Sequence, residues 1–329
     1  MPTEIETIIL DLQGRSQIGL DFAKQAFKSK KIEDEKIKEA LQYYLINWND
    51  YTHSGLFSLA CAAVGGDLHA TIPTQASLSM IAAAFDLHDD IIDRSKTKNA
   101  KPTVYGKYGM EVTLLLGNAF IIEGYTLLEK SILHLSSETQ EEILDTLNTS
   151  LFDVGNAHAY ELSLRGKSDS TFTEYWKLID NKAASLDADM KIGAIIGGGT
   201  EEEVRALARY GRIIGILTIL REEFIDIYEL EELSQKANIK FLPIPILFAL
   251  KDLSVKQQIH QLISKRRLSK KDRDDLLDLT LHSDHVRKIK QTMEELIKEA
   301  HTLPNYLIEN KSKSINQLNG LVESMLDGL

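Results

Sequence analysis

Four aspartates lie within one short segment of the chain, and their spacing places them on a single face of a helix. They are Asp86, Asp89, Asp90 and Asp93, and side chains three or four positions apart are neighbours on a helix. Like charges held so close together oppose folding unless a cation neutralises them. Carboxylate oxygens suit Mg²⁺, which commonly bridges protein carboxylates to the phosphates of a substrate. The segment therefore predicts a magnesium site made by Asp89, Asp90 and Asp93.

A solvated acidic surface is the alternative interpretation of this cluster. Residues 80–85, which precede the acids, are all apolar, and Ile91 and Ile92 interrupt the acids themselves. These apolar neighbours favour a core helix that ends at a cavity over a helix face exposed to water.

A second acidic cluster lies far along the sequence. Its members, Glu222, Glu223 and Asp226, repeat the i, i+1, i+4 spacing of the first cluster and also follow an apolar run, residues 213–220. We expect the two helices to face each other across a bundle and to hold a metal-bound diphosphate between their carboxylates.

The overall composition is that of an ordinary globular protein. Of the 329 residues, 43% are hydrophobic and 26% are charged, values typical of folded domains. A formal net charge of −11 without a long basic block argues against a nucleic-acid partner. The single cysteine, Cys61, excludes an internal disulfide and a zinc site with several cysteines.

We expect no targeting or membrane segment. Residues 1–6 lack the cationic start and apolar core of a signal peptide. The apolar runs around residues 55–65 and 240–250 are too short to span a bilayer. We expect a soluble, cytoplasmic protein without a transmembrane segment.

Helical periodicity runs through nearly the whole chain and predicts an all-helical fold. The six prolines fall at or between the ends of periodic stretches, and no alternating run typical of a strand occurs. Several segments are apolar on most sides and belong at the centre of one large bundle, so residues 1–329 are expected to form a single domain around a central cavity. The predicted helices cover residues 3–28, 33–47, 55–64, 73–94, 109–133, 137–165, 172–198, 200–228, 242–251, 254–264, 269–281, 283–302 and 304–327.

These motifs together resemble the trans-isoprenyl diphosphate synthase family over about residues 45 to 250. The match is strongest at His88–Asp93, which is similar to the family's first aspartate-rich motif. Residues 222–226 occupy the place of the second motif, with two aspartates replaced by glutamates. The further similar segments are Lys101-Pro102-Thr103 with Gly109, Lys182-Ala183-Ala184 and Phe241-Leu242-Pro243.

The resemblance implies an all-helical fold, usually three Mg²⁺ ions, and commonly a homodimer. It also implies a reaction in which an allylic prenyl diphosphate ionises to a carbocation, which isopentenyl diphosphate then attacks. Lys182 would contact the allylic diphosphate, because a cation stabilises the negative charge that develops as this group leaves; the alternative is a surface lysine.

Four other residues are candidates for substrate binding. Phe85, one turn before Asp89, could form an aromatic floor for the carbocation, or could simply pack in the core. Arg221 precedes the second acidic cluster, and Lys236 and Lys240 follow it. These three are candidate diphosphate-binding cations, and the alternative for the two lysines is a solvated loop.

The chain departs from the family where the acceptor would bind. The family holds isopentenyl diphosphate through a Gly-Lys-x-x-Arg-Pro segment, which here is residues 49–54. Its lysine is replaced by Asp50 and its arginine by His53, which could instead be a polar loop residue. A family arginine after the first motif is replaced by Asn99. Fixed cations are needed to hold a partly buried diphosphate, so we infer that isopentenyl diphosphate is not bound in the family's usual way.

Three functions fit these observations. The main expectation is a terpene-synthase-like enzyme, which ionises one allylic diphosphate and lets the cation cyclise or lose a proton. The alternative is a prenyltransferase that condenses an allylic diphosphate with isopentenyl diphosphate or another acceptor. The third is a non-catalytic subunit that regulates a related synthase, although random drift would hardly keep all six carboxylates.

Overall fold

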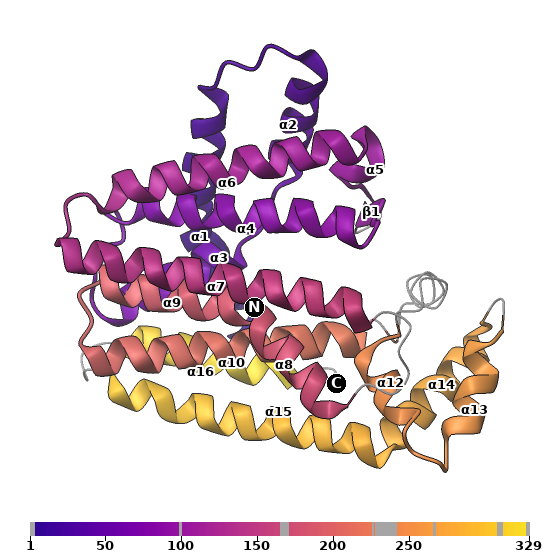
Figure 1. Cartoon of the computed structure of the whole chain (residues 1–329). Helices are drawn as coiled ribbons and strands as arrows, with labels where there is room; N and C mark the ends of the chain where they lie inside the picture. Colours follow the sequence, from indigo (N-terminus) through magenta and orange to yellow (C-terminus); the bar gives the residue numbers. More distant parts are fainter. Residues whose placement is uncertain are drawn as a thin grey trace. The chain divides into compact units, whose positions relative to one another are not determined.

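The computed structural model describes residues 4–98, 101–164, 171–225, 227, 242–265, 268–307 and 312–326. These residues are almost entirely helical, which confirms the predicted all-helical fold (Figure 1). One departure is a pair of antiparallel two-residue strands, β1 (Thr97–Lys98) and β2 (Lys101–Pro102). The sequence shows no alternating pattern there, so this hairpin was not predicted. The helices are α1 (Glu4–Lys28), α2 (Glu35–Asn47), α3 (Thr52–Ala63), α4 (Ile72–Ile92), α5 (Val104–Tyr108), α6 (Met110–Ile132), α7 (Ser137–Leu164), α8 (Phe172–Lys182), α9 (Ala184–Ile196), α10 (Glu201–Ile225), α12 (Ile244–Ala249), α13 (Lys256–Ile263), α14 (Lys270–His282), α15 (Asp284–Thr302) and α16 (Ser312–Glu323), with 3₁₀ turns at Leu303–Tyr306 and Ser324–Leu326.

The chain divides into two compact units. Unit 1 consists of Met1–Thr146, Asp189–Leu207 and Leu307–Ser314, and unit 2 of Leu147–Ala188, Ala208–Tyr306 and Ile315–Leu329. The expectation of a single domain over residues 1–329 stays a prediction.

Helix α4 is the central element of unit 1 and carries the first acidic cluster at its carboxyl end. It packs against α1, α3 and α6, and Figure 1 shows α4 and α6 side by side. Gly124 of α6 allows a close approach, because a Cβ atom there would lie 2.7 Å from Ile81. The hydroxyl of Ser77 donates to the Gly124 carbonyl oxygen at 2.7 Å. This packing fixes the orientation of α4 and therefore the position of the carboxylates at its end.

Helix α6 has one face packed and one face exposed. It is the one described helix that is long and apolar enough to cross a membrane by length and composition. That is weak evidence for a span, because a core helix passes the same test and α6 packs against α4. Its exposed apolar residues are Met110, Leu114, Leu115 and Ile122. The homodimer implied by the resemblance stays a prediction, and this face is where its interface would be sought.

Helix α10 is the corresponding buried element of unit 2. A Cβ atom at Gly211 would lie 2.4 Å from the Leu186 carbonyl oxygen, so the backbones of α9 and α10 are in close contact. Arg212 binds the Asp187 carboxylate at 2.8 Å and donates to the Asp180 carbonyl oxygen at 2.6 Å. These contacts hold α10 against the junction of α8 and α9.

Most predicted helices are present with ends shifted by a few residues. The segment predicted as one helix over 172–198 is instead two helices that break at Ala183. The short helix α5 was not predicted, and the segment predicted as one helix over 304–327 is split into shorter pieces. Neither proline nor glycine marks the break at Ala183, while Pro304 lies in the first of the shorter pieces.

We expect substitution of Gly211 by alanine to destabilise unit 2. The added methyl group would collide with backbone atoms, which cannot move aside as a flexible side chain can, and overpacking of this kind costs roughly 1–3 kcal/mol. The matched control is Gly155→Ala in α7, where a Cβ atom meets nothing within 4 Å. That change should stabilise the helix by about 0.5–1 kcal/mol. Urea denaturation of both variants tests this, and equal effects in the two would contradict the packing described.

Candidate active site

The first acidic cluster lies at the carboxyl end of α4, as the sequence predicted. Asp86 is exposed, Asp89 and Asp93 are half-buried, and Asp90 is only 7% exposed. Burial raises the pKa of Asp90 to about 7, and the charges of Asp86, Asp89 and Asp93 add to this while Lys98 opposes it. Negative charge at a helix carboxyl end is also disfavoured by the helix dipole. A carboxylate so poorly stabilised by protein groups suits a bound divalent cation.

No three carboxylate, imidazole or thiol groups among the described residues converge into a ready-made metal site. The magnesium site therefore stays a prediction, which the raised pKa of Asp90 supports.

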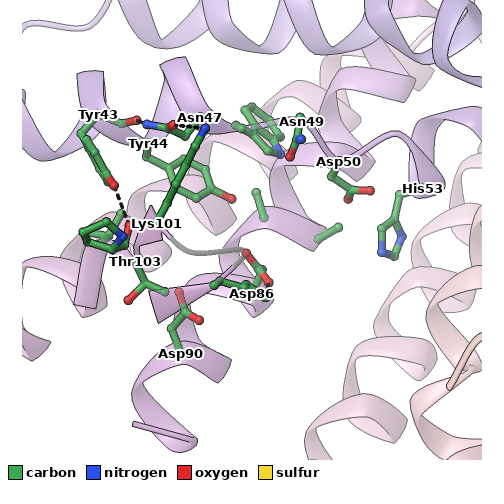
Figure 2. A pocket seen from close by; sticks show the side chains of 16 residues that line it. Tyr43, Tyr44, Asn47, Asn49, Asp50, His53, Asp86, Asp90, Lys101 and Thr103 are labelled. Carbon is green, nitrogen blue, oxygen red and sulfur yellow. Dashed lines mark hydrogen bonds and ion pairs between the residues drawn. The ribbon is translucent and has the colours of Figure 1, made fainter. Parts of the chain in front are cut away.

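A cavity of about 350 Å³ lies beside this cluster, within unit 1. Its walls come from the end of α2, the segment 48–53, the buried side of α4 and the β1–β2 hairpin. Figure 2 shows Asp86 and Asp90 in one wall, with Lys101 and Tyr43 on one side of them and Asp50 and His53 on the other. Phe85 is half-buried one turn before Asp89, and the neighbouring Ala82 and Ala83 line this cavity instead.

The hairpin side of the cavity is held by hydrogen bonds and an ion pair. The Tyr43 hydroxyl donates to the Pro102 carbonyl oxygen at 2.6 Å, and Lys101 Nζ lies 3.4 Å from Asn47 Oδ1. Lys98 Nζ is 2.5 Å from Asp86 Oδ1. Burial lowers the pKa of Lys98, but the charge and hydrogen bond of Asp86 outweigh it and raise the pKa to about 12. Lys98 is therefore charged, and Asp86 neutralises it.

The opposite side contains an ion pair that the sequence did not predict. His53 Nδ1 lies 2.6 Å from Oδ2 of Asp189, a buried residue of α9. Burial lowers the pKa of His53, but the charges of Asp189 and Asp50 and the hydrogen bond outweigh it and raise the pKa to about 9. The one signal in the sequence was an aspartate placed directly between the apolar residues Ala188 and Met190.

The second acidic cluster lies at the end of α10, in unit 2. Glu222 is exposed, while Glu223 Oε2 accepts a hydrogen bond from the Ile244 backbone N–H at 2.8 Å, at the start of α12. Arg221 Nη1 donates to the Met325 carbonyl oxygen at 3.3 Å. Asp226 lies outside the described residues, as do Lys236 and Lys240. Because the clusters belong to different units, their predicted facing arrangement stays a prediction.

Lys182 is the last residue of α8 and is positioned by that helix. A capping box between Thr171 and Glu174 starts α8. At its other end, Lys182 Nζ forms an ion pair with Glu161 Oε2 of α7 at 2.6 Å. Both side chains are largely buried, so Lys182 is not an ordinary surface lysine. Its predicted contact with a diphosphate stays a prediction.

Comparison with known proteins identifies relatives of the chain. A family model described as polyprenyl synthetase matches residues 34–280. The short chain isoprenyl diphosphate synthase of Methanothermobacter thermautotrophicus is 28% identical over 202 residues, 61% of this chain and 61% of that protein. The geranylgeranyl diphosphate synthase of Methanosarcina mazei is 25% identical over 62% of this chain and 63% of that protein. The matched part of the chain therefore spans less than two thirds of the length of these relatives.

Solved structures show the same fold. Geranylgeranyl pyrophosphate synthetase from Pyrococcus horikoshii has a TM-score of 0.85 at 20% identity and covers 99% of both chains. Polyprenyl synthase from Caulobacter crescentus, complexed with calcium and isoprenyl diphosphate, has a TM-score of 0.80 at 16% identity over 98% of both chains. At these identities the likeness concerns the fold alone, and it confirms the predicted isoprenoid-synthase architecture.

We expect Asp90→Asn to stabilise the metal-free protein. The substitution removes a charge that is disfavoured by burial and by neighbouring acids, which should raise the free energy of unfolding by roughly 1–3 kcal/mol. Added Mg²⁺ should raise the melting temperature of the unsubstituted protein and have a much smaller effect on the variant. Thermal and urea unfolding with and without Mg²⁺ measure both effects. A variant that is less stable, yet responds fully to Mg²⁺, would contradict the metal assignment.

The His53–Asp189 pair predicts a specific pH dependence of stability. Because the pKa of His53 is raised above its usual value, the pair's contribution is fully present below about pH 6.5 and is lost as the pH rises through about 9. The groups that face His53 are Asp189, Asp50 and, at longer range, Asp86. The free energy of unfolding should fall by roughly 1–3 kcal/mol between these pH values relative to His53→Gln. Urea titrations at pH 6, 7.5 and 9 test this, and parallel curves for the two proteins would disprove it.

Proposed function

Because the chain belongs to the polyprenyl synthetase family, we propose that it is a prenyltransferase whose donor is an allylic prenyl diphosphate. The observation that carries this proposal is the acid-bearing end of α4 beside a cavity. The named relatives include isoprenyl and geranylgeranyl diphosphate synthases, which favours the prenyltransferase alternative. They give no support to the terpene-synthase-like reaction that we expected first.

The proposed reaction breaks one bond and makes another. The bond between C1 of the prenyl chain and a diphosphate oxygen breaks, and its electron pair leaves with the diphosphate. An electron pair of the acceptor then forms the new bond to C1, and a proton of the acceptor passes to the released pyrophosphate. A dry, apolar surrounding is needed because water would otherwise capture the carbocation.

The carboxylates of α4 would hold the metal in this reaction. Bound Mg²⁺ supplies positive charge that stabilises the leaving diphosphate. Asp89, Asp90 and Asp93 are the residues of this chain that suit that role, since they share one helix face and have oxygen ligands. The number of ions, and the parts played by Lys182, Glu222 and Glu223, stay predictions from the resemblance.

Removal of Asp89 tests the proposed function. With Mg²⁺, an acceptor such as isopentenyl diphosphate, and geranyl, farnesyl or geranylgeranyl diphosphate, we expect acceptor-dependent pyrophosphate release by the unsubstituted protein. We expect a loss of about 100-fold or more in Asp89→Ala, because a metal ligand is gone. The matched control is Asp275→Ala, which removes an exposed carboxylate of α14 and should leave the rate unchanged. Pyrophosphate release and the organic products are measured together.

Two outcomes would contradict the proposal. A cyclised hydrocarbon formed from the allylic diphosphate alone would restore the terpene-synthase-like reaction. No turnover under any condition, with activation of a co-expressed synthase, would assign the chain to a regulatory subunit.

A further inference from the structure

Unit 1 contains a second cavity, at the opposite end of α4 from the acids. Its volume is about 460 Å³, which is within the range of cavities that hold small molecules. Its walls come from α1, α3, the connection between α3 and α4, and the first turn of α4. This α1 cavity shares no wall residue with the cavity beside the acids, so a ligand bound in it would not be held by the residues assigned to the metal and the diphosphate.

The charged groups in the walls of the α1 cavity neutralise each other. Arg15 Nε lies 2.5 Å from Asp11 Oδ2, and both residues belong to α1. Lys313, which does not line the cavity, approaches Asp11 Oδ1 to 3.5 Å, but its side chain is 77% exposed, so water and salt screen its charge. A charged ligand would leave water here without gaining an unpaired opposite charge from the walls, which is unfavourable. The walls therefore favour an uncharged ligand.

Much of the remaining wall is aliphatic. The apolar residues are Leu10, Ile18, Leu68 and Ile72. Leu10 and Ile18 are 58% and 51% exposed, although α1 packs against α3 and α4. A ligand with an apolar body would remove this surface from water, which is favourable in proportion to the area covered.

Gly14 leaves space at the α1 side of the cavity. It lies inside a helix, where glycine is less favourable than alanine. A Cβ atom at Gly14 would meet nothing within 4 Å, whereas one at Gly19 of the same helix would lie 2.7 Å from Gln75 Oε1. Helix packing thus requires the glycine at position 19 but not the one at position 14. A longer side chain at Gly14 has open space to occupy in the cavity that it lines.

Two buried polar residues also line the cavity. Ser58 is 1% exposed and Gln75 is 2% exposed. Gln75 Oε1 has no hydrogen-bond partner among the described residues, although buried polar groups normally have one. The last torsion of a glutamine is broad and roughly two-fold, so its amide can turn to present either oxygen or nitrogen to a ligand. A hydroxyl group both donates and accepts, so it can satisfy the amide in either orientation.

We propose that the α1 cavity is a binding site for an uncharged amphiphile, namely an aliphatic alcohol. Its chain covers the aliphatic walls, and its hydroxyl group forms hydrogen bonds with Gln75 and Ser58. Prenyl alcohols and straight-chain alcohols share this chemistry, and the experiment below distinguishes them. The site is separate from the proposed reaction and does not depend on it.

Amide chemical-shift mapping of the full chain by nuclear magnetic resonance tests the site. Geraniol and 1-octanol are titrated separately, without metal, so that the acids of α4 play no part. We expect saturable shifts in residues 10–18 and 68–75, with a Kd of about 1 mM or below. Shifts with geraniol alone would assign the site to a prenyl chain, and shifts with both alcohols to aliphatic alcohols in general. Geranyl diphosphate should leave these signals unchanged, because the walls have no unpaired cation for it.

Filling the cavity should remove the site. We expect Gly14→Leu to weaken geraniol binding at least about 10-fold, because the new side chain occupies the space of the ligand. The matched control is Gly155→Leu in α7, where a Cβ atom also meets nothing within 4 Å. It makes the same change of helix propensity outside the cavity and should leave the Kd unchanged.

A second variant keeps the inference testable if Gly14→Leu does not fold. Gln75→Met removes the amide at nearly constant size, so it should weaken geraniol binding by about 3- to 10-fold. It should also raise the urea midpoint, because a buried polar atom without a partner is removed.

Absence of saturable shifts in residues 10–18 and 68–75 with either alcohol would overturn the inference, as would shifts confined to other residues. Equal geraniol affinities for the unsubstituted protein and Gly14→Leu would overturn it as well. Geranyl diphosphate that shifts these signals as strongly as geraniol would show that the ligand class is wrong. The pyrophosphate-release assay is a separate measurement, so failure of the proposed function would leave this result unaffected.

Discussion

Repulsion among the carboxylates at the end of α4 is the constraint on which the rest of the site depends. Four acids occupy adjacent turns at the end of a helix where the dipole already disfavours negative charge. The preceding turns of α4 are buried against α1, α3 and α6. This packing stabilises the helix and offsets the repulsion among the acids at its end. Lys98 offsets the charge of Asp86. Retention of an unfavourable arrangement of this kind is typical of a functional site.

The surroundings of the cavity follow from the same electrostatics. Two of the three cations in the wall near α4 pair with acids, Lys98 with Asp86 and His53 with Asp189. Such internal pairs lower the cost of burying charge, but they also remove the cations that could have held an anionic ligand. A bound metal would then add to Lys101 as a positive charge available to a diphosphate in this cavity.

Local signals in the sequence were enough to find most of the helices and the α4 cluster. The apolar run before Asp89 predicted a buried helix that ends at a cavity, and α4 is such a helix, with Pro73 near its start. Contacts between distant residues could not be found in this way. His53 and Asp189 are separated by 136 positions, and Glu223 and Ile244, which share a hydrogen bond, are separated by 21. The break at Ala183 was missed because neither proline nor glycine marks it. The identity of the reaction was the weakest prediction, because the lost cations suggested a cyclase while the relatives are prenyl diphosphate synthases.

The central claim is that the carboxylates of α4 bind a divalent cation together with a diphosphate. Nuclear magnetic resonance with paramagnetic Mn²⁺ and methylene diphosphonate tests this claim most directly, because broadening falls steeply with distance from the ion. We expect the backbone amide signals of residues 86–93 to broaden first, and more strongly with the diphosphonate than with Mn²⁺ alone. Unchanged signals for that segment, with broadening confined to other acidic surfaces such as α14, would contradict it.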